Sequence, residues 1–184
     1  MRYRCKILAA NLLVIAALAA IGSPAEAAVS ACSSSVATLE PTQQNVRQVK
    51  SAVLCLVNRE RTRRGLPRLS LDSRLSRAAA KHSRDMVRRG YFDHVSPGGR
   101  TVRHRIMSTG WLRGARGWTI GENLAWGSGR YADAADTVRS WMLSPGHRAN
   151  ILNAKFRQIG IGIALGTPET ESGATYTTTF GARL

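Results

Sequence analysis

The chain has 184 residues, and 27 lysines and arginines outnumber 11 aspartates and glutamates, which gives a formal net charge of +16. This length suits one domain and excludes an assembly of several large ones. A basic excess favours anionic partners such as phospholipid head groups, wall polymers or nucleic acid. All but four of the basic residues are arginines scattered along the chain, which also fits codon bias in a GC-rich genome. We therefore expect no specific nucleic-acid site and keep an anionic cell-surface ligand as an alternative.

Residues 1–27 have the three parts of a secretion signal. Three basic residues open the segment, residues 7–21 form an apolar run, and Ala25-Glu26-Ala27 supplies a small-x-small cleavage site. The alternative, a transmembrane anchor, needs roughly 20 apolar residues, whereas this run has about 15. We therefore predict a signal peptide that is removed, and a secreted protein without a membrane anchor.

Cysteine usage fits export, because removal of the signal takes Cys5 away and leaves Cys32 and Cys55. Two cysteines in an oxidising compartment usually pair, and such a bridge contributes roughly 3 kcal/mol by restricting the unfolded chain. The predicted disulfide ties a polar tether, residues 28–43, to the first helix. Two unpaired thiols are the alternative.

Apolar residues at three- and four-residue steps predict helices over about 42–64, 73–89, 102–109 and 132–143. Gly65 ends the first helix, Asp72 or Ser73 caps the second, and Gly90 ends it. The apolar stretch 120–126 is predicted as a strand that leads into a loop. His82 lies on the apolar face of the second helix, which favours a hydrogen-bonded core histidine over a ligand.

The C-terminal part changes to a period of two. Ile159, Ile161 and Ile163 alternate with glycines, the pattern of a strand with small residues on one face. Residues 166–173 are predicted as a hairpin loop and residues 175–180 as the returning strand. Helices followed by an antiparallel hairpin indicate an α+β domain with helices packed on a small sheet.

Three short segments place ionisable groups beside glycine or proline, in turns that can expose them: residues 91–99, 121–124 and 141–148. Their His94, Glu122 and His147 are the ligand set of an open divalent-metal site. The spacing does not fix them on one helix face, so the pattern alone is weak.

Other polar and aromatic residues have simpler interpretations. Ser96 and Ser144 are conceivable nucleophiles, but both precede Pro-Gly, so turn formation explains them better. His104 lies between two arginines and is expected to be solvated. Three tryptophans near the glycine-rich stretch either line a groove or pack in the core: Trp111, Trp118 and Trp126.

In this order the segments resemble the CAP superfamily, the secreted domain shared by cysteine-rich secretory proteins, antigen-five proteins and plant pathogenesis-related proteins. The resemblance is to its bacterial SCP-like branch. It runs from about Val46 to Phe180 and includes Leu56-Val57-Asn58-Arg59-Glu60-Arg61 and Ala80-Lys81-His82-Ser83-Arg84-Asp85-Met86. It implies that residues 44–184 form a three-layer α-β-α sandwich with a small central antiparallel sheet and an open cleft.

The cleft of this family usually holds two histidines and two acidic residues, in some members around a divalent cation. The resemblance carries these roles to His94, His147 and Glu122, and it carries the second acidic role to Ser144. A serine hydroxyl is a poor metal ligand beside a carboxylate, so zinc, calcium or magnesium would bind weakly and keep one more water.

Two functions follow from this pattern. The first is a monomeric extracellular protein that binds a small amphipathic or lipid-like ligand, or a wall or host component, without catalysis. The alternative is a divalent-metal-assisted extracellular hydrolase in which a cation held by His94, Glu122 and His147 activates water. The serine at the second acidic position and the lack of a nucleophile motif favour binding over catalysis.

Overall fold

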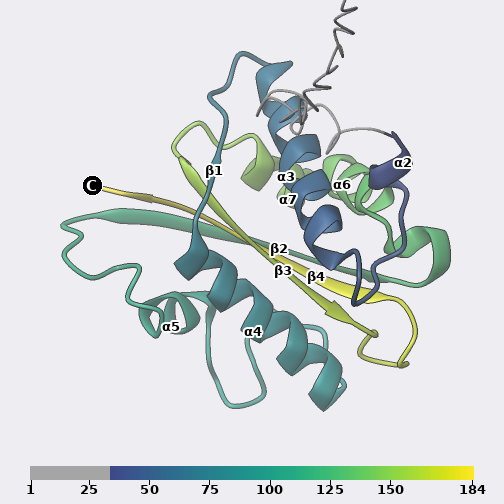
Figure 1. The fold of residues 1–184 in the computed structure, drawn as a ribbon. Helices are drawn as coiled ribbons and strands as arrows, with labels where there is room; N and C mark the ends of the chain where they lie inside the picture. The colour runs from purple at the N-terminus through teal and green to yellow at the C-terminus, as the bar shows by residue number, and fades with distance from the viewer. Residues whose placement is uncertain (1–33) are drawn as a thin grey trace, which may run out of the picture.

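The elements follow the predicted order, helices first and the hairpin last, in a computed structural model that describes residues 34–184 (Figure 1). The helices are α2 (Ser34–Ala37), α3 (Val46–Thr62), α4 (Ser73–Arg89), α5 (Val102–Met107), the 3-10 helix η1 (Gly129–Ala132), α6 (Ala134–Leu143) and α7 (Pro145–Ile151). The strands are β1 (Ser70–Leu71), β2 (Trp118–Gly127), β3 (Gln158–Leu165) and β4 (Ala174–Arg183).

The predicted signal peptide and Cys32 lie outside the described residues. Removal of residues 1–27 and the Cys32–Cys55 disulfide therefore stay predictions. Within residues 34–184, no helix combines the length and the apolar content that a membrane span requires.

The strands form one sheet in the order β1-β3-β4-β2. β4 pairs antiparallel with both long neighbours, in a register that places Glu122 opposite Thr179 and Gly162 opposite Thr177. β1 adds a two-residue parallel pair with β3, so the sheet is mixed and not purely antiparallel as the resemblance implied. β2 is the edge strand on the opposite side, which exposes its outer edge to the loops and helices around it.

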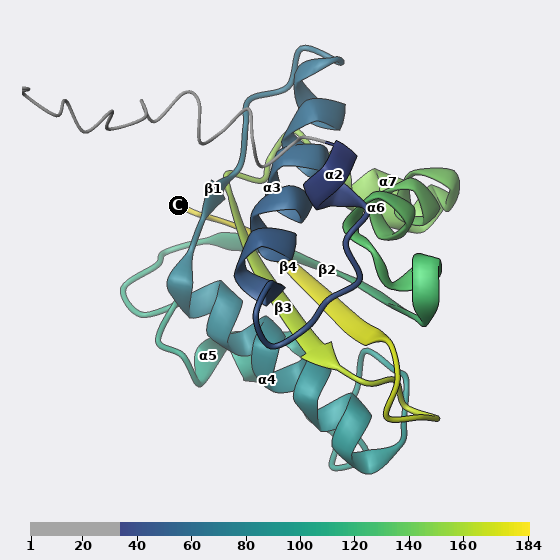
Figure 2. The ribbon, with the colours of Figure 1, turned by 45° about the vertical axis from the view of Figure 1, so that its right-hand side comes forward.

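Helices cover both faces of the sheet, which confirms the three-layer α-β-α arrangement (Figures 1 and 2). α3, α6 and α7 lie on one face, and α4 and α5 lie on the other. The larger core, on the first face, includes Val53, Trp141 and Ile161. A smaller core around Leu75 and Trp111 lies under α4 and α5.

The alternation in β3 matches these two layers. Ile159, Ile161 and Ile163 belong to the larger core. The glycines between them face α4: a Cβ atom on Gly160 would lie 2.1 Å from the carbonyl carbon of Leu75. The small residues predicted on one face of this strand therefore let the helix backbone approach the sheet closely.

Two α-helices form where the sequence predicted none. Ser144-Pro145-Gly146 was expected to form a turn, but it begins α7, because proline is well tolerated in the first helical turn. α2 lies within the predicted tether, and its Ala37 is buried in the larger core. α6 begins at Ala134 and not at residue 132, because the Asp133 side chain caps it by accepting from the Asp136 N–H at 2.7 Å.

Candidate functional site

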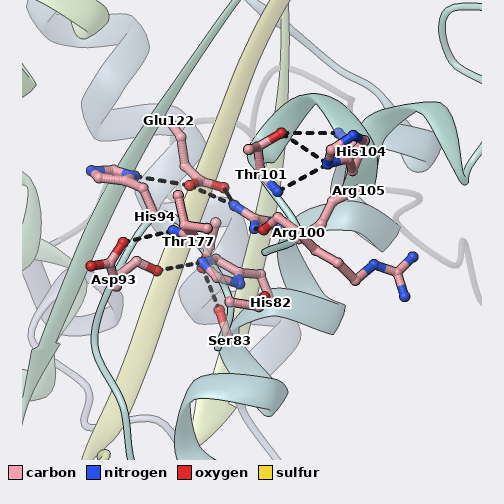
Figure 3. Close-up of polar contacts among 12 residues, drawn as sticks. His82, Ser83, Asp93, His94, Arg100, Thr101, His104, Arg105, Glu122 and Thr177 are labelled. Atoms are coloured by element: carbon pink, nitrogen blue, oxygen red, sulfur yellow. Dashed lines mark hydrogen bonds and ion pairs between the residues drawn. The ribbon is translucent and has the colours of Figure 1, made fainter. Parts of the chain in front are cut away.

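Three of the predicted site residues come from the sheet and from both helical layers. Glu122 lies on the edge strand β2, His94 on the loop between α4 and α5, and His147 on α7. The Nδ1 atom of His94 lies 2.9 Å from Oε1 of Glu122 (Figure 3). The backbone carbonyl of His147 accepts from Asn123, the neighbour of Glu122 on β2, so His147 lies at the same strand as Glu122. These three residues are called the His–Glu site below.

The carboxylate of Glu122 is held by Arg105, which the sequence analysis did not single out. Nη2 of Arg105 donates to both carboxylate oxygens at 2.8 Å, and Nη1 donates to the Arg100 carbonyl at 2.8 Å (Figure 3). The side chains of Glu122 and Arg105 are only 3% and 5% exposed. One sequence feature could have indicated its burial: Arg105 is next to Ile106, which is buried on the inward face of α5.

His82 on α4 holds the loop that carries His94 in place. This histidine is fully buried, and its Nε2–H donates to the Asp93 carbonyl at 2.9 Å. The side chain of Asp93 in turn accepts from the Val95 N–H at 2.7 Å. The prediction that His82 is a hydrogen-bonded core histidine is confirmed, and its bond places the residue directly before His94.

Two asparagines fix α7, and with it His147, against the edge of β2. Nδ2 of Asn123 donates to the His147 carbonyl at 3.0 Å. Nδ2 of Asn150 donates to the Glu122 carbonyl at 3.1 Å and to Oδ1 of Asn123 at 2.8 Å. The imidazole of His147 makes no hydrogen bond to the part of the chain that the structure describes. Ser144, where α7 starts, makes no side-chain capping bond and is partly exposed.

The pKa values of His94 and His147 are shifted in opposite directions. The hydrogen bond to Glu122 raises the pKa of His94 above its ordinary value. Burial and, second, the charge of His94 lower the pKa of His147. As pH falls, His94 therefore takes up a proton before His147 does, and it forms a charged hydrogen bond with the buried carboxylate.

The predicted cation does not fit this arrangement. Among residues 34–184, no group of three or more histidine, cysteine, aspartate and glutamate side chains is arranged to hold a metal ion. Both oxygens of Glu122 already accept from Arg105, and the guanidinium repels a cation there. Ser144 supplies no compensating charge.

The remaining candidates have structural roles. Ser96 is 6% exposed and forms a turn, because its carbonyl accepts from the Gly99 N–H at 2.7 Å. The exposed His104 joins Thr101 in a capping box at the start of α5 (Figure 3). Trp111 is in the smaller core, whereas Trp118 and Trp126 are 42% and 40% exposed.

Two large hollows of the described surface do not include the His–Glu site. Two cavities of about 740 Å³ each follow α4, and none of His94, Glu122 and His147 lines either of them. The side chain of His94 is 55% exposed. The His–Glu site is therefore an open surface site above a buried ion pair, and not the interior of either of these cavities.

A family model described as "CAP: Cysteine-rich secretory protein family" matches residues 54–179, which include His94, Glu122 and His147. Two curated relatives come from Bacillus subtilis (strain 168). YkwD is 37% identical over 136 residues, which cover 74% of this chain and 48% of that protein. YlbC, named a membrane protein, is 32% identical over 111 residues, 60% of this chain and 30% of that protein. The chain thus spans about half the length of YkwD, and less of YlbC.

Solved structures show the same fold. An extracellular protein containing an SCP domain from Bacillus anthracis has a TM-score of 0.62 and 29% identity, with 76% of this chain and 43% of that chain covered. An outer surface protein from Borrelia burgdorferi has a TM-score of 0.61 and 19% identity, with 78% and 96% covered. At that identity the second likeness concerns the fold alone.

Proposed function

The chain belongs to the CAP family of cysteine-rich secretory proteins, and we propose that it is an exported protein that binds a small amphipathic ligand without turning it over. Export is supported by the secretion signal predicted for residues 1–27. It also agrees with the extracellular description of the Bacillus anthracis neighbour.

One observation favours binding over catalysis: both oxygens of the Glu122 carboxylate already accept hydrogen bonds within the protein. A general base or a metal ligand needs a lone pair that can reach its target. Both oxygens of Glu122 accept from the buried Arg105, and one also contacts His94. Breaking the hydrogen bonds of these oxygens would leave a buried charge unpaired, which costs about 3–5 kcal/mol. Glu122 therefore acts as the anchor that orients His94.

The groups that remain open to a ligand combine polar and apolar character. The half-exposed imidazole of His94 and the ring of His147 offer polar contacts. Each histidine has exposed apolar neighbours in the chain: Phe92 and Val95 are both 44% exposed, and Leu143, just before Ser144, is 79% exposed. Small-ligand sites typically combine a few placed polar groups with apolar area, as an amphipathic molecule requires.

A fluorescent long-chain fatty acid, titrated into the secreted chain, tests binding. We expect saturable binding that weakens about fivefold in Leu143→Ser, the loss expected when roughly 1 kcal/mol of apolar contact is removed. His147→Ala should weaken it as well. Leu184→Ser is the matched control, because Leu184 is 86% exposed and lies beside Gly117, at the start of β2. Equal affinity in all four proteins would overturn the proposed location of the ligand.

A panel of ester and peptide substrates tests the absence of turnover. We expect no hydrolysis by the secreted chain with zinc, calcium, magnesium or a chelator present. Turnover that disappears with the chelator and in His147→Ala would instead establish the metal-assisted hydrolase.

A further inference from the structure

A cavity along α4, lined also by residues of α3, α5 and β3, gathers positive charge from distant parts of the chain. It has a volume of about 740 Å³, and its lining includes Lys50 of α3 and Arg77, Lys81 and Arg84 of α4. β1 pairs with β3 only through residue 159, so the rest of this sheet edge has no strand beside it, and Ile161 lies in the lining. These four cationic residues and their cavity are called the basic groove below.

No acidic residue lines the basic groove. Within residues 34–184, none of its four cations has an ion-pair partner. The fifth cation of the lining, Arg105, is already neutralised by Glu122. The nearest acid along α4, Asp85, accepts from Arg88 at 3.0 Å and lies 3.7 Å from Arg89. Asp85 lines the second cavity along α4, where it is already paired with Arg88.

The cations of the groove repel one another across the two helices. Lys50 is half-buried, and its pKa is lowered first by that burial and then by the charge of Arg84. An ammonium group that is partly withdrawn from water beside a like charge raises the free energy of the unliganded protein. An anion in the groove would remove this unfavourable interaction. The groove would therefore bind an anion more tightly than a group of ordinary surface cations does.

The spacing of the cations suits a series of anionic groups. Arg77, Lys81 and Arg84 follow one face of α4 at four- and three-residue steps, and seven residues of α-helix span about 10 Å. Arginine, which supplies two of these cations, binds phosphate through paired N–H groups. A second cavity of about 740 Å³ shares Lys81 and Arg84 and prolongs the groove along the helix.

We propose that the basic groove is a binding site for a linear phosphate-bearing polyanion, separate from the His–Glu site. Lys50 and Arg84 hold one phosphate between the two helices, and Arg77 and Lys81 hold its neighbours along α4. The proposal does not depend on the amphipathic ligand proposed above, because His94, Glu122 and His147 do not line the cavity, and Arg105, which does, is already paired with Glu122.

Titration of inorganic polyphosphate into the secreted chain at several salt concentrations tests the proposal. The double variant Lys50→Gln/Arg84→Gln should bind at least about tenfold more weakly, because two charged contacts are lost. Its affinity should also depend less steeply on salt, by about 0.7 in the logarithmic slope for each contact removed. The matched control is Arg68→Gln/Lys155→Gln, which removes one lysine and one arginine at exposed positions outside the groove.

Equal losses in the two double variants would mean that net charge alone attracts the polymer, which overturns the proposal. Binding of phosphatidylglycerol vesicles without binding of polyphosphate would also overturn it, in favour of a lipid surface. Orthophosphate should bind far more weakly than the polymer, and equal affinity per phosphate would contradict a site for a series of groups.

Amine labelling gives a second measurement on the unmodified protein. Burial lowers the pKa of Lys50, so its amine should react with acetic anhydride at neutral pH. Polyphosphate should protect Lys50 and leave Lys155 unchanged. Equal rates for Lys50 with and without the polymer would overturn the proposal even if the double variants failed to fold.

Discussion

The buried carboxylate of Glu122 controls the protonation of the His–Glu site. It lies between the guanidinium of Arg105 and the imidazole of His94. Because Arg105 donates to both carboxylate oxygens of Glu122 and holds that side chain in place, His94 has a fixed acceptor. His147 has no such acceptor among the described residues, and burial opposes its charge. The site therefore presents two chemically different imidazoles to a ligand, one cationic over a wider pH range and one neutral.

The pH dependence of stability follows from these two shifts. The pKa of His94 is raised in the folded state, so its contribution is complete below the unfolded value of about 6.5 and is lost as pH rises through the folded pKa. The pKa of His147 is lowered, so its contribution is complete above about 6.5 and is lost as pH falls through the folded value. Titration followed by NMR should give His94 a higher pKa than His147.

Glu122→Gln tests the cause of the His94 shift. The amide keeps the shape of the side chain but removes the charge, so the pKa of His94 should fall toward its ordinary value. Glu60→Gln is the control, since Glu60 pairs only with Arg63 and Arg64 on the surface of α3. An unchanged His94 titration in Glu122→Gln would show that Glu122 is not its partner in solution.

At the scale of single residues, the sequence pointed to His94, Glu122 and His147 but not to the other side chains that contact them. His94, Glu122 and His147 stand beside glycine or proline in short motifs, which local patterns reveal. Arg105 and Asn150 contact Glu122 from 17 and 28 residues away. Which side chain reaches a buried carboxylate depends on how helices dock on the sheet, and that information is not local.

The contact between α4 and β3 shows how much a whole element depends on one strand face. Alternating isoleucines and glycines predicted a strand with one small face, and the structure explains why the face is small. A Cβ atom on Gly162 would lie 2.2 Å from the Ala80 nitrogen, on the helix backbone. No side chain can rotate away to relieve that contact, so the helix itself would have to move.

Gly162→Ala should therefore destabilise the domain by about 3 kcal/mol, as overpacking against a fixed backbone does. Urea denaturation measures the change. Gly98→Ala is the matched control, because Gly98 has ordinary backbone angles and a Cβ atom there would have no neighbouring atom within 4 Å. Its stability should stay within about 0.5 kcal/mol of the wild type. Similar values for the two variants would mean that α4 is not packed on β3 as described.

Element boundaries were predicted where local signals exist and missed where tertiary contacts decide. The Asp72 cap and the left-handed Gly90 at the end of α4 were both predictable, and both are present. α7 was missed because Ser-Pro-Gly opens a turn or a helix equally well, and the bonds of Asn123 and Asn150 to β2 favour the helix here. β1 has two residues and no periodicity to detect.

For the whole molecule, the fold converts scattered arginines into specific arrangements. The sequence showed only a high net charge, for which codon bias was a sufficient explanation. The structure assigns different roles to individual cations: Arg105 neutralises Glu122, three cations of α4 join Lys50 in one groove, and Arg61 is fully buried. Arg61 stands near the end of α3, although arginine is rarely buried without a paired charge.

Arg61 joins α3 to a segment 90 residues away without any acidic partner among the described residues. Its Nε donates to the Pro67 carbonyl at 2.8 Å, and Nη1 donates to the carbonyls of Ile151 at 2.7 Å and Asn153 at 3.0 Å. Nη2 donates to the Phe156 carbonyl at 3.3 Å. One planar group thus satisfies four carbonyls at the point where α7 ends and the chain turns toward β3.

Arg61→Lys should destabilise the domain by about 3 kcal/mol, because a single ammonium cannot reach all four carbonyls and leaves buried acceptors unpaired. Thermal and urea denaturation should both show the loss. Arg59→Lys, two residues earlier on the same helix and exposed, should change stability by less than about 0.5 kcal/mol. If the two variants were equally stable, the charge of residue 61 would be sufficient, and the guanidinium geometry would not be what closes this end of the molecule.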